Sequence, residues 1–284
     1  MIAVLYPNFQ KKNALKCARE TCDVLNNSGI DVCISENFRG EFSDKPFVKF
    51  ENTEKSVKTA DFVIAIGGDG TILRCSQLLM GTDTKLLGIN TGTLGFMAGL
   101  EADQLDRLKL LKTGEYEISD RMTLDVVCTE NGKKVTYTAL NEISARSGSF
   151  RICDFEVYSD GYLVGKYRAD GVLFSTPSGS TAYALSAGGP VIEPDLECIE
   201  MTQICPHSLF SRATLFSSCR KLMLTSRTRN SEYMVISVDG EMHIHLEKNQ
   251  SIEIFRGKNN IRFINLIGNS FHESLCRKLC KPIK

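Results

Sequence analysis

The apolar run of residues 62–66 stops abruptly at Gly67-Gly68-Asp69-Gly70, and a helical pattern follows at once. A short continuous run rich in β-branched residues is typical of a strand that is buried on both faces of a parallel sheet. Glycines let the backbone approach a ligand, and the free N–H groups at the start of the next helix attract phosphate oxygens. The stretch therefore predicts a phosphate site at the edge of a parallel sheet. There, we expect Gly68 either to approach the phosphate closely or to adopt a positive φ.

Asp69 is the unusual residue of this turn, because a carboxylate repels phosphate by about 4 kcal/mol per charge pair at roughly 4 Å and an effective dielectric of about 20. Such an acid needs a compensating task, such as holding a divalent metal or accepting a proton from an attacking hydroxyl. The alternative is a hairpin turn, since Asp-Gly is a common turn pair. The helical sequence after Gly70 argues against a hairpin, because a second strand should follow there.

The length of the chain indicates how many domains to expect, and its composition excludes some classes of binding partner. A chain of 284 residues exceeds the usual length of one domain, so two domains are expected. Basic and acidic residues number 34 each, which argues against broad binding to nucleic acid or to membrane surfaces. No apolar run approaches the length of a membrane span, and the opening residues lack the features of a signal peptide. We expect a soluble, cytoplasmic protein with its eleven cysteines reduced.

The first part of the chain alternates strand and helix patterns. Strands are predicted at residues 1–6, 30–34, 62–66 and 86–89, and helices at 13–27, 72–80 and 101–113. Residues 35–50 have no period and are predicted as a loop, and residues 51–59 as one or two helical turns. The order predicts an α/β domain over residues 1–119 with a parallel sheet covered by helices. Residues 90–96 would form either a second loop facing the glycine turn or a plain connection.

From Asp120 onward the hydrophobic period becomes two. Strand patterns occur at residues 123–129, 135–143, 154–159, 163–167, 222–225, 234–238, 242–246 and 251–255, with hairpin turns at Asn131-Gly132 and Asp160-Gly161. Residues 120–257 are therefore predicted as a mostly antiparallel, sandwich-like β domain. The tail 258–284 has an apolar run at 263–267 and a helix-like pattern at 270–280, and it could return to the first domain.

A second cluster of small polar residues lies at 175–190, with the sequence STPSGSTAYALSAGGP. Hydroxyls and glycines this dense provide many donors and acceptors on a closely packed backbone, which suits a polar planar ligand. A serine-rich turn at a sheet corner explains the segment equally well when it is taken alone.

Taken together, these segments closely resemble bacterial-type NAD kinases. The family's signatures include a GGDGT loop, an Asn-Glu or Asn-Asp pair and a TPxGSTAYxxSAGGP segment, and all three are present in that order at Gly67, Asn141 and Thr176. Residues 167–171 and 204–209 also match family segments, so the resemblance spans residues 1 to about 270. The long serine-glycine segment is its most specific part.

The resemblance implies a reaction and an architecture. A donor, either ATP or polyphosphate, would phosphorylate the adenosine ribose 2′-hydroxyl of NAD to give NADP, with a divalent cation, expected to be Mg²⁺. The family combines an α/β domain with a β-sandwich-like domain, holds its site in the cleft between them and assembles as dimers or tetramers.

The resemblance also implies roles for individual residues. Asp69 would be the general base, and Glu142 would grip the ribose diol of the acceptor. The donor side would use Gly67, Gly68, Gly70, Thr71 and Arg74; the acceptor adenosine would be held by Asn141 and Glu142, approached by Arg151, Arg168 and Asp170, and surrounded at its rings by Thr181, Ala182, Tyr183 and Ser186. The sequence departs from the pattern at Arg151 and Glu241, where some relatives carry histidine and glutamine.

Two rival functions share part of the pattern. A lipid or sugar kinase can carry the same GGDGT loop, but it leaves the serine-glycine segment unexplained. A dinucleotide-binding regulator without catalysis would need no acid in its phosphate loop, whereas this chain has Asp69.

Overall fold

The computed structural model describes residues 1–92, 95–130, 132–149, 151–209, 211–227, 233–241, 244–268 and 271–279. It divides into two compact units, one made of Met1–Asp120 with Ile261–Lys284 and the other of Arg121–Asn260. Asn131 of a predicted hairpin turn and the first two residues of the predicted strand 242–246 lie outside the described residues.

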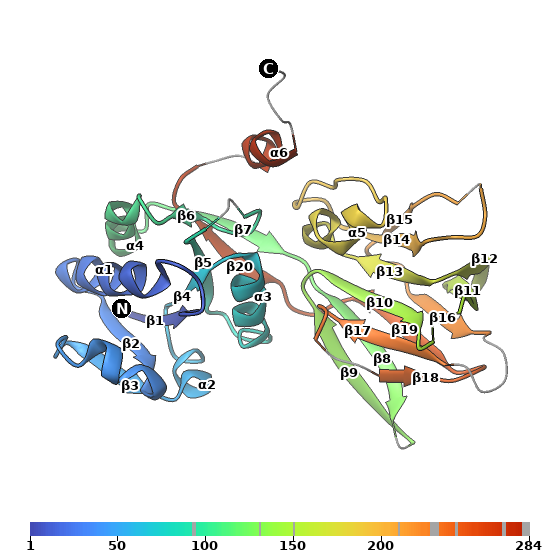
Figure 1. The fold of residues 1–284 in the computed structure, drawn as a ribbon, viewed down its shortest axis with the longest axis horizontal. Helices are drawn as coiled ribbons and strands as arrows, with labels where there is room; N and C mark the ends of the chain where they lie inside the picture. The colour runs from blue at the N-terminus through green and yellow to red at the C-terminus, as the bar shows by residue number, and fades with distance from the viewer. Residues whose placement is uncertain are drawn as a thin grey trace. The chain divides into compact units, whose positions relative to one another are not determined.

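The first unit is built on an eight-stranded sheet in the order β3-β2-β1-β4-β5-β20-β7, with β6 paired to β5 (Figure 1). Every pairing from β3 to β20 along this order is parallel. The strands are β1 (Ile2–Pro7), β2 (Asp31–Ser35), β3 (Val48–Glu51), β4 (Phe62–Gly67), β5 (Lys85–Asn90), β6 (Leu100–Glu101), β7 (Glu117–Arg121) and β20 (Ile261–Asn265).

The helices of this unit follow the spacing of their apolar residues. In α1 (Ala14–Asn27), Ala14, Ala18, Cys22 and Leu25 are buried, a spacing of one helical turn that places them on one face. The other helices are α2 (Thr53–Ser56), α3 (Asp69–Gln77), α4 (Leu110–Thr113) and α6 (Phe271–Leu279), with 3₁₀ turns η1 (Glu36–Phe38), η2 (Gly40–Phe42) and η3 (Leu105–Lys109).

Two predictions for this unit were wrong. Residues 35–50, predicted as a loop, contain η1, η2 and the start of β3, because Val48 and Phe50 pair in register with Val32 and Ile34 of β2. The helix predicted over residues 101–113 begins only at Leu105, because Glu101 is taken by the short strand β6. In both places a tertiary pairing decided the structure of a short segment.

The sheet of the first unit has a topological switch point between β1 and β4. From β1 the chain passes through α1 to β2 on one side, whereas β4 pairs with the other side of β1. In open α/β sheets, ligands bind outside the carboxyl ends of the strands at such a switch point. The glycine turn after β4 therefore lies where a ligand is expected.

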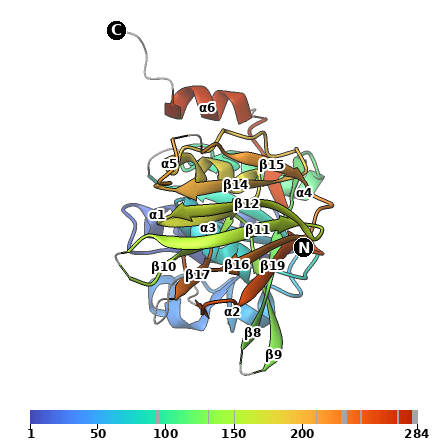
Figure 2. The ribbon, with the colours of Figure 1, turned by 90° about the vertical axis from the view of Figure 1, so that its right-hand side faces the viewer.

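The second unit consists of two antiparallel sheets of six strands each, in the orders β15-β14-β13-β10-β17-β18 and β12-β11-β16-β19-β8-β9 (Figure 2). One hydrophobic core combines residues of both sheets, for example Val126 and Leu224 with Ile143 and Phe174. This confirms the predicted fold class. The strands are β8 (Leu124–Glu130), β9 (Lys133–Ala139), β10 (Glu142–Ser147), β11 (Cys153–Ser159), β12 (Tyr162–Ala169), β13 (Gly171–Ser175), β14 (Cys198–Ile204), β15 (Thr214–Ser217), β16 (Leu222–Ser226), β17 (Met234–Val238), β18 (Ile244–Leu246) and β19 (Ser251–Arg256).

The register of three neighbouring strands brings their ends to one edge of the first of these sheets. Glu142, the first residue of β10, is paired with Ser175, the last residue of β13. Ile143 is paired with Val238 at the end of β17. The 3₁₀ turn η4 (Ser178–Thr181) and the short helix α5 (Tyr183–Ser186) follow β13 directly.

Every cysteine among the described residues is free, and Cys205, Cys219 and Cys276 are exposed. Burial raises the pKa of Cys17 to about 11 and that of Cys22 to about 12. These thiols act as small core residues of the first unit.

Candidate functional site

The glycine turn joins β4 directly to α3, and its three glycines have different roles. A Cβ atom on Gly67 would lie 2.4 Å from Oγ1 of Thr71, so packing alone excludes a side chain there. Gly68 has an extended backbone with φ of −112° and ψ of −176°, and no atom of the described residues lies within 4 Å of a Cβ built on it or on Gly70. The suggestion of a positive φ at Gly68 was therefore wrong. Space above the turn is open, which is the condition for close approach of a ligand.

Asp69 is the first residue of α3, and its carboxylate is held from several sides. Its Oδ2 accepts a hydrogen bond from the backbone N–H of Phe96 (2.9 Å), and its Oδ1 accepts one from that of Met97 (3.2 Å). A Cβ on Gly95 would lie 2.0 Å from Oδ1, so glycine is required there for close packing. Of the two alternatives for residues 90–96, the structure supports a loop that faces the glycine turn; Thr93 and Leu94 lie outside the described residues.

Lys278 of α6 also reaches this carboxylate. Its Nζ lies 3.5 Å from Oδ2 of Asp69 and 3.9 Å from the centre of the Phe96 ring. Nothing in the local sequence around either residue indicates this pair, because they are 209 positions apart.

A cavity of about 680 Å³ opens at the switch point of the first unit. Its volume lies in the range of small-molecule sites, and its wall combines aromatic rings with polar groups. The rings of Phe9 and Phe38 meet edge to face at 4.5 Å. Nδ2 of Asn8 donates to Oγ1 of Thr71 (3.2 Å), which ties the end of β1 to the start of α3. The lining residues are Leu5, Tyr6, Pro7, Asn8, Phe9, Gln10, Ser35, Asn37, Phe38, Thr53, Thr71 and Arg74.

In the second unit, the Asn141-Glu142 pair is fixed by a residue that the sequence reasoning missed. Asp239, at the end of β17, accepts hydrogen bonds from the backbone N–H groups of Leu140 (2.8 Å), Asn141 (2.8 Å) and Glu142 (3.1 Å). Its own N–H donates to the carbonyl of Glu142 (3.0 Å). The only local signal was an Asp-Gly pair, which reads as an ordinary hairpin turn.

The serine-glycine segment packs directly against this pair. Oγ1 of Thr176 donates to the carbonyl of Leu140 (2.6 Å), and the N–H of Thr176 donates to that of Asn141 (2.9 Å). The N–H of Gly179 donates to Oγ1 of Thr176 (3.0 Å), and a Cβ on Gly179 would lie 2.1 Å from the Asn141 carbonyl oxygen. The motif is therefore a close-packed backbone support for Asn141 and Glu142.

Oε2 of Glu200, which is paired in register with Ser175, is a buried oxygen atom at this edge without a hydrogen-bond partner among the described residues. Oδ1 of Asn141 and Oε2 of Glu142 are two more. Asn141 and Glu142 are each only 8% exposed. Leaving a buried polar atom unpaired costs about 1–3 kcal/mol. Burial raises the pKa of Glu142 to about 7, and the nearby carboxylate of Asp239 adds to the rise. A ligand with hydroxyl groups would satisfy the oxygens of Asn141 and Glu142.

The residues implied for the acceptor rings lie just beyond this support. Thr181 ends η4, Ala182 links it to α5, and both are half-buried, as is Tyr183. Tyr183 packs against a small apolar cluster that includes Leu173. Ser186, the last residue of α5, is exposed.

The structure does not bring Arg168 and Asp170 to the edge that holds Glu142. They lie around the start of β13, whereas Ser175, the partner of Glu142, ends it. Arg168 makes a double ion pair with Asp154 (2.7 and 2.9 Å), which raises its pKa. Arg151 is exposed in the connection before β11.

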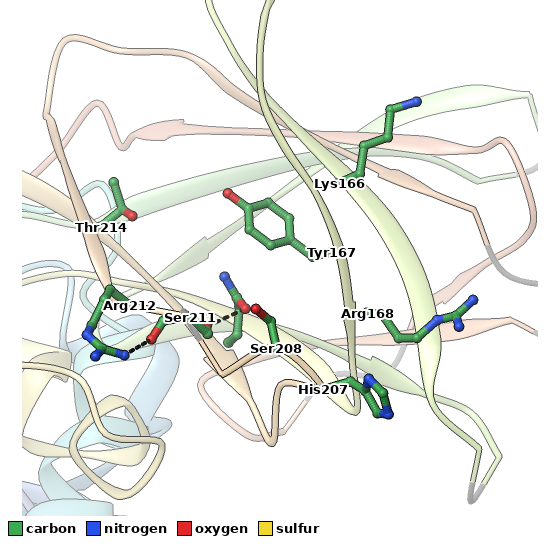
Figure 3. A pocket seen from close by; sticks show the side chains of 9 residues that line it. Lys166, Tyr167, Arg168, His207, Ser208, Ser211, Arg212 and Thr214 are labelled. Carbon is green, nitrogen blue, oxygen red and sulfur yellow. Dashed lines mark hydrogen bonds between the residues drawn. The ribbon is translucent and has the colours of Figure 1, made fainter.

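Arg168 lines a second cavity, of about 470 Å³, within the second unit (Figure 3). Tyr167 and Arg168 leave β12 in different directions, and the N–H of His207 donates to the carbonyl of Arg168 (3.0 Å). Its wall includes the cations Lys166, Arg168 and Arg212, of which Lys166 is paired with Glu156 (2.9 Å) and Arg168 with Asp154. The other lining residues are Tyr167, Gln203, His207, Ser208, Ser211 and Thr214.

The described residues contain no cluster of three or more His, Cys, Asp or Glu side chains that could hold a metal ion. Within the same residues, no helix is long and apolar enough to cross a membrane.

A glycine turn and an acid at the switch point of a parallel sheet are joined in one chain to a β-sandwich in which buried oxygens of Asn141 and Glu142 have no partner among the described residues. This combination indicates a nucleotide-binding phosphotransferase. Comparison with known proteins identifies the family. Residues 4–116 match the ATP-NAD kinase N-terminal domain, and residues 140–266 match the ATP-NAD kinase C-terminal domain. The NAD kinase of Moorella thermoacetica is 38% identical over 228 residues, which are 80% of this chain and 73% of that protein. The chain belongs to the NAD kinase family and is an enzyme.

Two solved structures resemble the whole chain. An NAD kinase from Archaeoglobus fulgidus in complex with ATP has a TM-score of 0.71 and 26% identity over 92% of both chains. Yeast NADH kinase complexed with NADH has a TM-score of 0.91 at 22% identity and covers 100% of this chain and 89% of that chain. The second similarity shows the fold alone.

Proposed function

We propose that this enzyme transfers the γ-phosphoryl group of ATP to the 2′-hydroxyl of the adenosine ribose of NAD and so produces NADP. One observation carries the proposal: the carboxylate of Asp69 stands at the N-terminus of α3, where a site built only to bind phosphate would have none. An acid there has a purpose when a hydroxyl must lose its proton to attack that phosphate.

The donor occupies the cavity at the switch point of the first unit. Its phosphates lie over the open backbone of Gly68 and Gly70, where N–H groups of the first turn of α3 are available. Phe9 and Phe38 offer apolar surface for a base, and exposed Arg74 provides positive charge. The ATP bound to the Archaeoglobus relative supports this donor, and inorganic polyphosphate remains the alternative.

The acceptor is held at the edge of the second unit. The unpaired Oε2 of Glu142 accepts hydrogen bonds from the ribose diol, and the unpaired Oδ1 of Asn141 accepts from the adenosine. Thr181, Ala182, Tyr183 and exposed Ser186 surround the rings in this proposal.

The transfer itself requires positioning and charge neutralisation more than covalent chemistry. The ribose oxygen forms a bond to the γ-phosphorus, and the bond from that phosphorus to the β,γ-bridging oxygen breaks. ADP leaves with the electron pair, and the hydroxyl proton passes to Asp69. The hydrogen bonds that the backbone N–H groups of Phe96 and Met97 donate to Asp69 fix the carboxylate in place for this step.

We infer that Mg²⁺ enters with the donor as a Mg–ATP complex. Mg²⁺ commonly binds through substrate phosphates and keeps several waters, so it does not need a cage of protein ligands. When bound, the ion neutralises charge on the phosphate oxygens.

Arg168 and Asp170 cannot grip the same ribose as Glu142 within one chain, because they lie at the opposite end of β13. We propose that they act on the dinucleotide from a second copy of the chain, in a homo-oligomer. Arg151 is assigned to the same acceptor side on family resemblance alone.

The test is to incubate the protein with NAD, ATP and Mg²⁺ and to follow NADP with an NADP-specific dehydrogenase. Polyphosphate replaces ATP in a parallel reaction, and diacylglycerol and fructose 6-phosphate replace NAD. We expect NADP from NAD and no product from the other acceptors. Phosphorylation of the lipid or the sugar, or none of NAD, would overturn the proposal.

A further inference from the structure

The last described helix, α6, brings a cation to the glycine turn. Lys278 is close to the end of α6, and its side chain is 21% exposed. Its ammonium lies between Oδ2 of Asp69 (3.5 Å) and the face of the Phe96 ring (3.9 Å to the ring centre). Because the N–H of Phe96 also donates to Oδ2 of Asp69, one loop residue orients both charged groups.

The position of this ammonium is unfavourable without an anion. The N-terminus of α3 carries the positive end of the helix dipole, which repels cations. The single charge of Asp69 faces that dipole, two backbone N–H donors and the ammonium together. The carboxylate of Glu101 also interacts electrostatically with Asp69, so two acids stand in the region of this ammonium. Among the described residues, no atom lies within 4 Å of a Cβ built on Gly68 or Gly70, which leaves space for a phosphate beside the ammonium.

We propose that Lys278 is a catalytic residue that binds the phosphoryl group during its transfer. The proposal rests on the proposed function, since it places a donor phosphate at the glycine turn. A polyphosphate carries more negative charge than one carboxylate, so the ammonium moves from Asp69 to the phosphoryl oxygens when the donor binds. This releases Oδ2 of Asp69 to accept the hydroxyl proton. Lys278 keeps its own proton and acts as a point charge.

The neighbouring Arg277 provides a matched control. It lies on the same helix, is exposed, and interacts electrostatically with Glu101. Lys278→Gln and Arg277→Gln thus each remove one positive charge from α6, but only the first removes the ammonium beside Asp69. Arg277 is exposed and Lys278 is partly buried, so thermal unfolding is used to verify that both variants fold.

The experiment measures kcat, the KM for ATP and the KM for NAD in the wild type and the two variants, with Mg²⁺ present. For Lys278→Gln, we expect kcat/KM for ATP to fall about 10²- to 10³-fold, as when one group that stabilises transition-state charge is removed. The KM for NAD should stay unchanged, and Arg277→Gln should stay within about twofold of the wild type. Lys278→Arg should restore part of the activity, since it keeps the charge but not its geometry.

Several outcomes would overturn the role. If kcat/KM for ATP were the same in Lys278→Gln as in the wild type, Lys278 would have no role in the transfer. A higher value would mean that Lys278 blocks the base. Equal losses in both glutamine variants would mean that only the overall charge of α6 matters. If the wild type forms no NADP, the proposed function fails separately. In that case the affinity for Mg–ATP, measured by calorimetry, still tests Lys278, because equal affinities in the wild type and Lys278→Gln would contradict contact with phosphate.

Discussion

At the scale of single residues, the proposed chemistry depends on two carboxylates in contrasting surroundings. Asp69 is surrounded by two backbone N–H donors and an ammonium. Glu142 is buried beside another carboxylate, and its pKa is raised to about 7. Asp69 lies next to the proposed phosphate site. Glu142 has an oxygen that can accept hydrogen bonds from hydroxyl groups of a ligand.

Replacing Asp69 with asparagine keeps the shape of the side chain and removes its basicity. We expect kcat to fall about 10²- to 10⁴-fold, the usual contribution of a general base, while the affinity for NAD changes little. Turnover and calorimetry on the same preparation measure the two effects. Asp106→Asn, the same change at an exposed position of η3, is the control and should have no effect. Wild-type turnover in Asp69→Asn would exclude Asp69 as the base.

Glu142 should also distinguish substrate from product. Once the 2′-hydroxyl carries phosphate, the carboxylate loses a donor and gains a negative neighbour, so it favours NAD over NADP. Glu142→Gln weakens charge-assisted hydrogen bonds by about 1 kcal/mol or more. NAD affinity should fall, while NADP affinity should fall less or rise. Titration of both dinucleotides into both proteins measures the ratio, and an unchanged ratio would contradict the role.

The raised pKa of Glu142 predicts a dependence of stability on pH. In the unfolded chain this group titrates near its ordinary value of 4.5, and in the folded protein near about 7. The folded state therefore holds the proton more tightly, so the stabilisation is complete below pH 4.5 and is lost as the pH rises to about 7. The amount is about 3 kcal/mol.

Urea unfolding of wild type and Glu142→Gln without nucleotides, at several pH values, measures this loss. The advantage of the wild type over the variant should shrink by that amount across this range. A difference that stays constant with pH would show that Glu142 is not perturbed by burial.

At the scale of elements, the glycine turn and the loop at residues 90–96 form one structure around Asp69. Gly67 and Gly95 are required for packing, because a Cβ on either would collide with Thr71 or Asp69. Gly68 and Gly70 have no such neighbour among the described residues, and we propose that a ligand explains their lack of a side chain. This division separates the structural glycines of the motif from the functional ones.

Gly68→Ser tests the division. Gly68 is the N-cap of α3, and serine is a favoured N-cap whose hydroxyl accepts from a backbone N–H of the first turn. We expect the free energy of unfolding to stay equal or to rise by about a few tenths of a kcal/mol. Activity should be lost, because the hydroxyl takes an N–H that the donor phosphate needs.

Gly67→Ala provides the contrast, because its Cβ would collide with Thr71 and lower stability. Thermal unfolding and turnover separate the two effects. Normal turnover and donor affinity in a folded Gly68→Ser would mean that this turn does not bind phosphate.

At the scale of the whole molecule, each unit has its own core and its own proposed nucleotide. The cavity at the switch point belongs to the first unit, and the unpaired oxygens of Asn141 and Glu142 belong to the second. A ligand slows amide exchange where it stabilises local structure.

We therefore predict that each nucleotide alone slows hydrogen exchange in a different set of segments. Mg–ATP should protect the first turn of α3 and the segment after β1, and NAD should protect residues 140–142 and η4. Peptide-level exchange by mass spectrometry measures both. Protection of the same segments by both nucleotides would contradict separate donor and acceptor sites.

The sequence by itself determined what depends on neighbouring residues. The strand–glycine–helix turn at Gly67, the alternation of strands and helices, the change to a period of two at Asp120 and the serine-glycine motif are all local patterns, and they were sufficient for the fold class and the family. Each is encoded within a window of some ten to fifteen residues, where periodicity and turn chemistry operate.

Only the tertiary structure decided which distant residues meet. Asp239 fixes the Asn141-Glu142 turn from 97 to 99 positions away, and Lys278 reaches Asp69 from 209 positions away. The register of β10 against β13 separates Arg168 from Glu142, although the family resemblance implies that both act on the acceptor. Such contacts depend on how whole strands and helices pack, and no local propensity encodes that, because the free energy that selects them comes from burial and pairing across the entire fold.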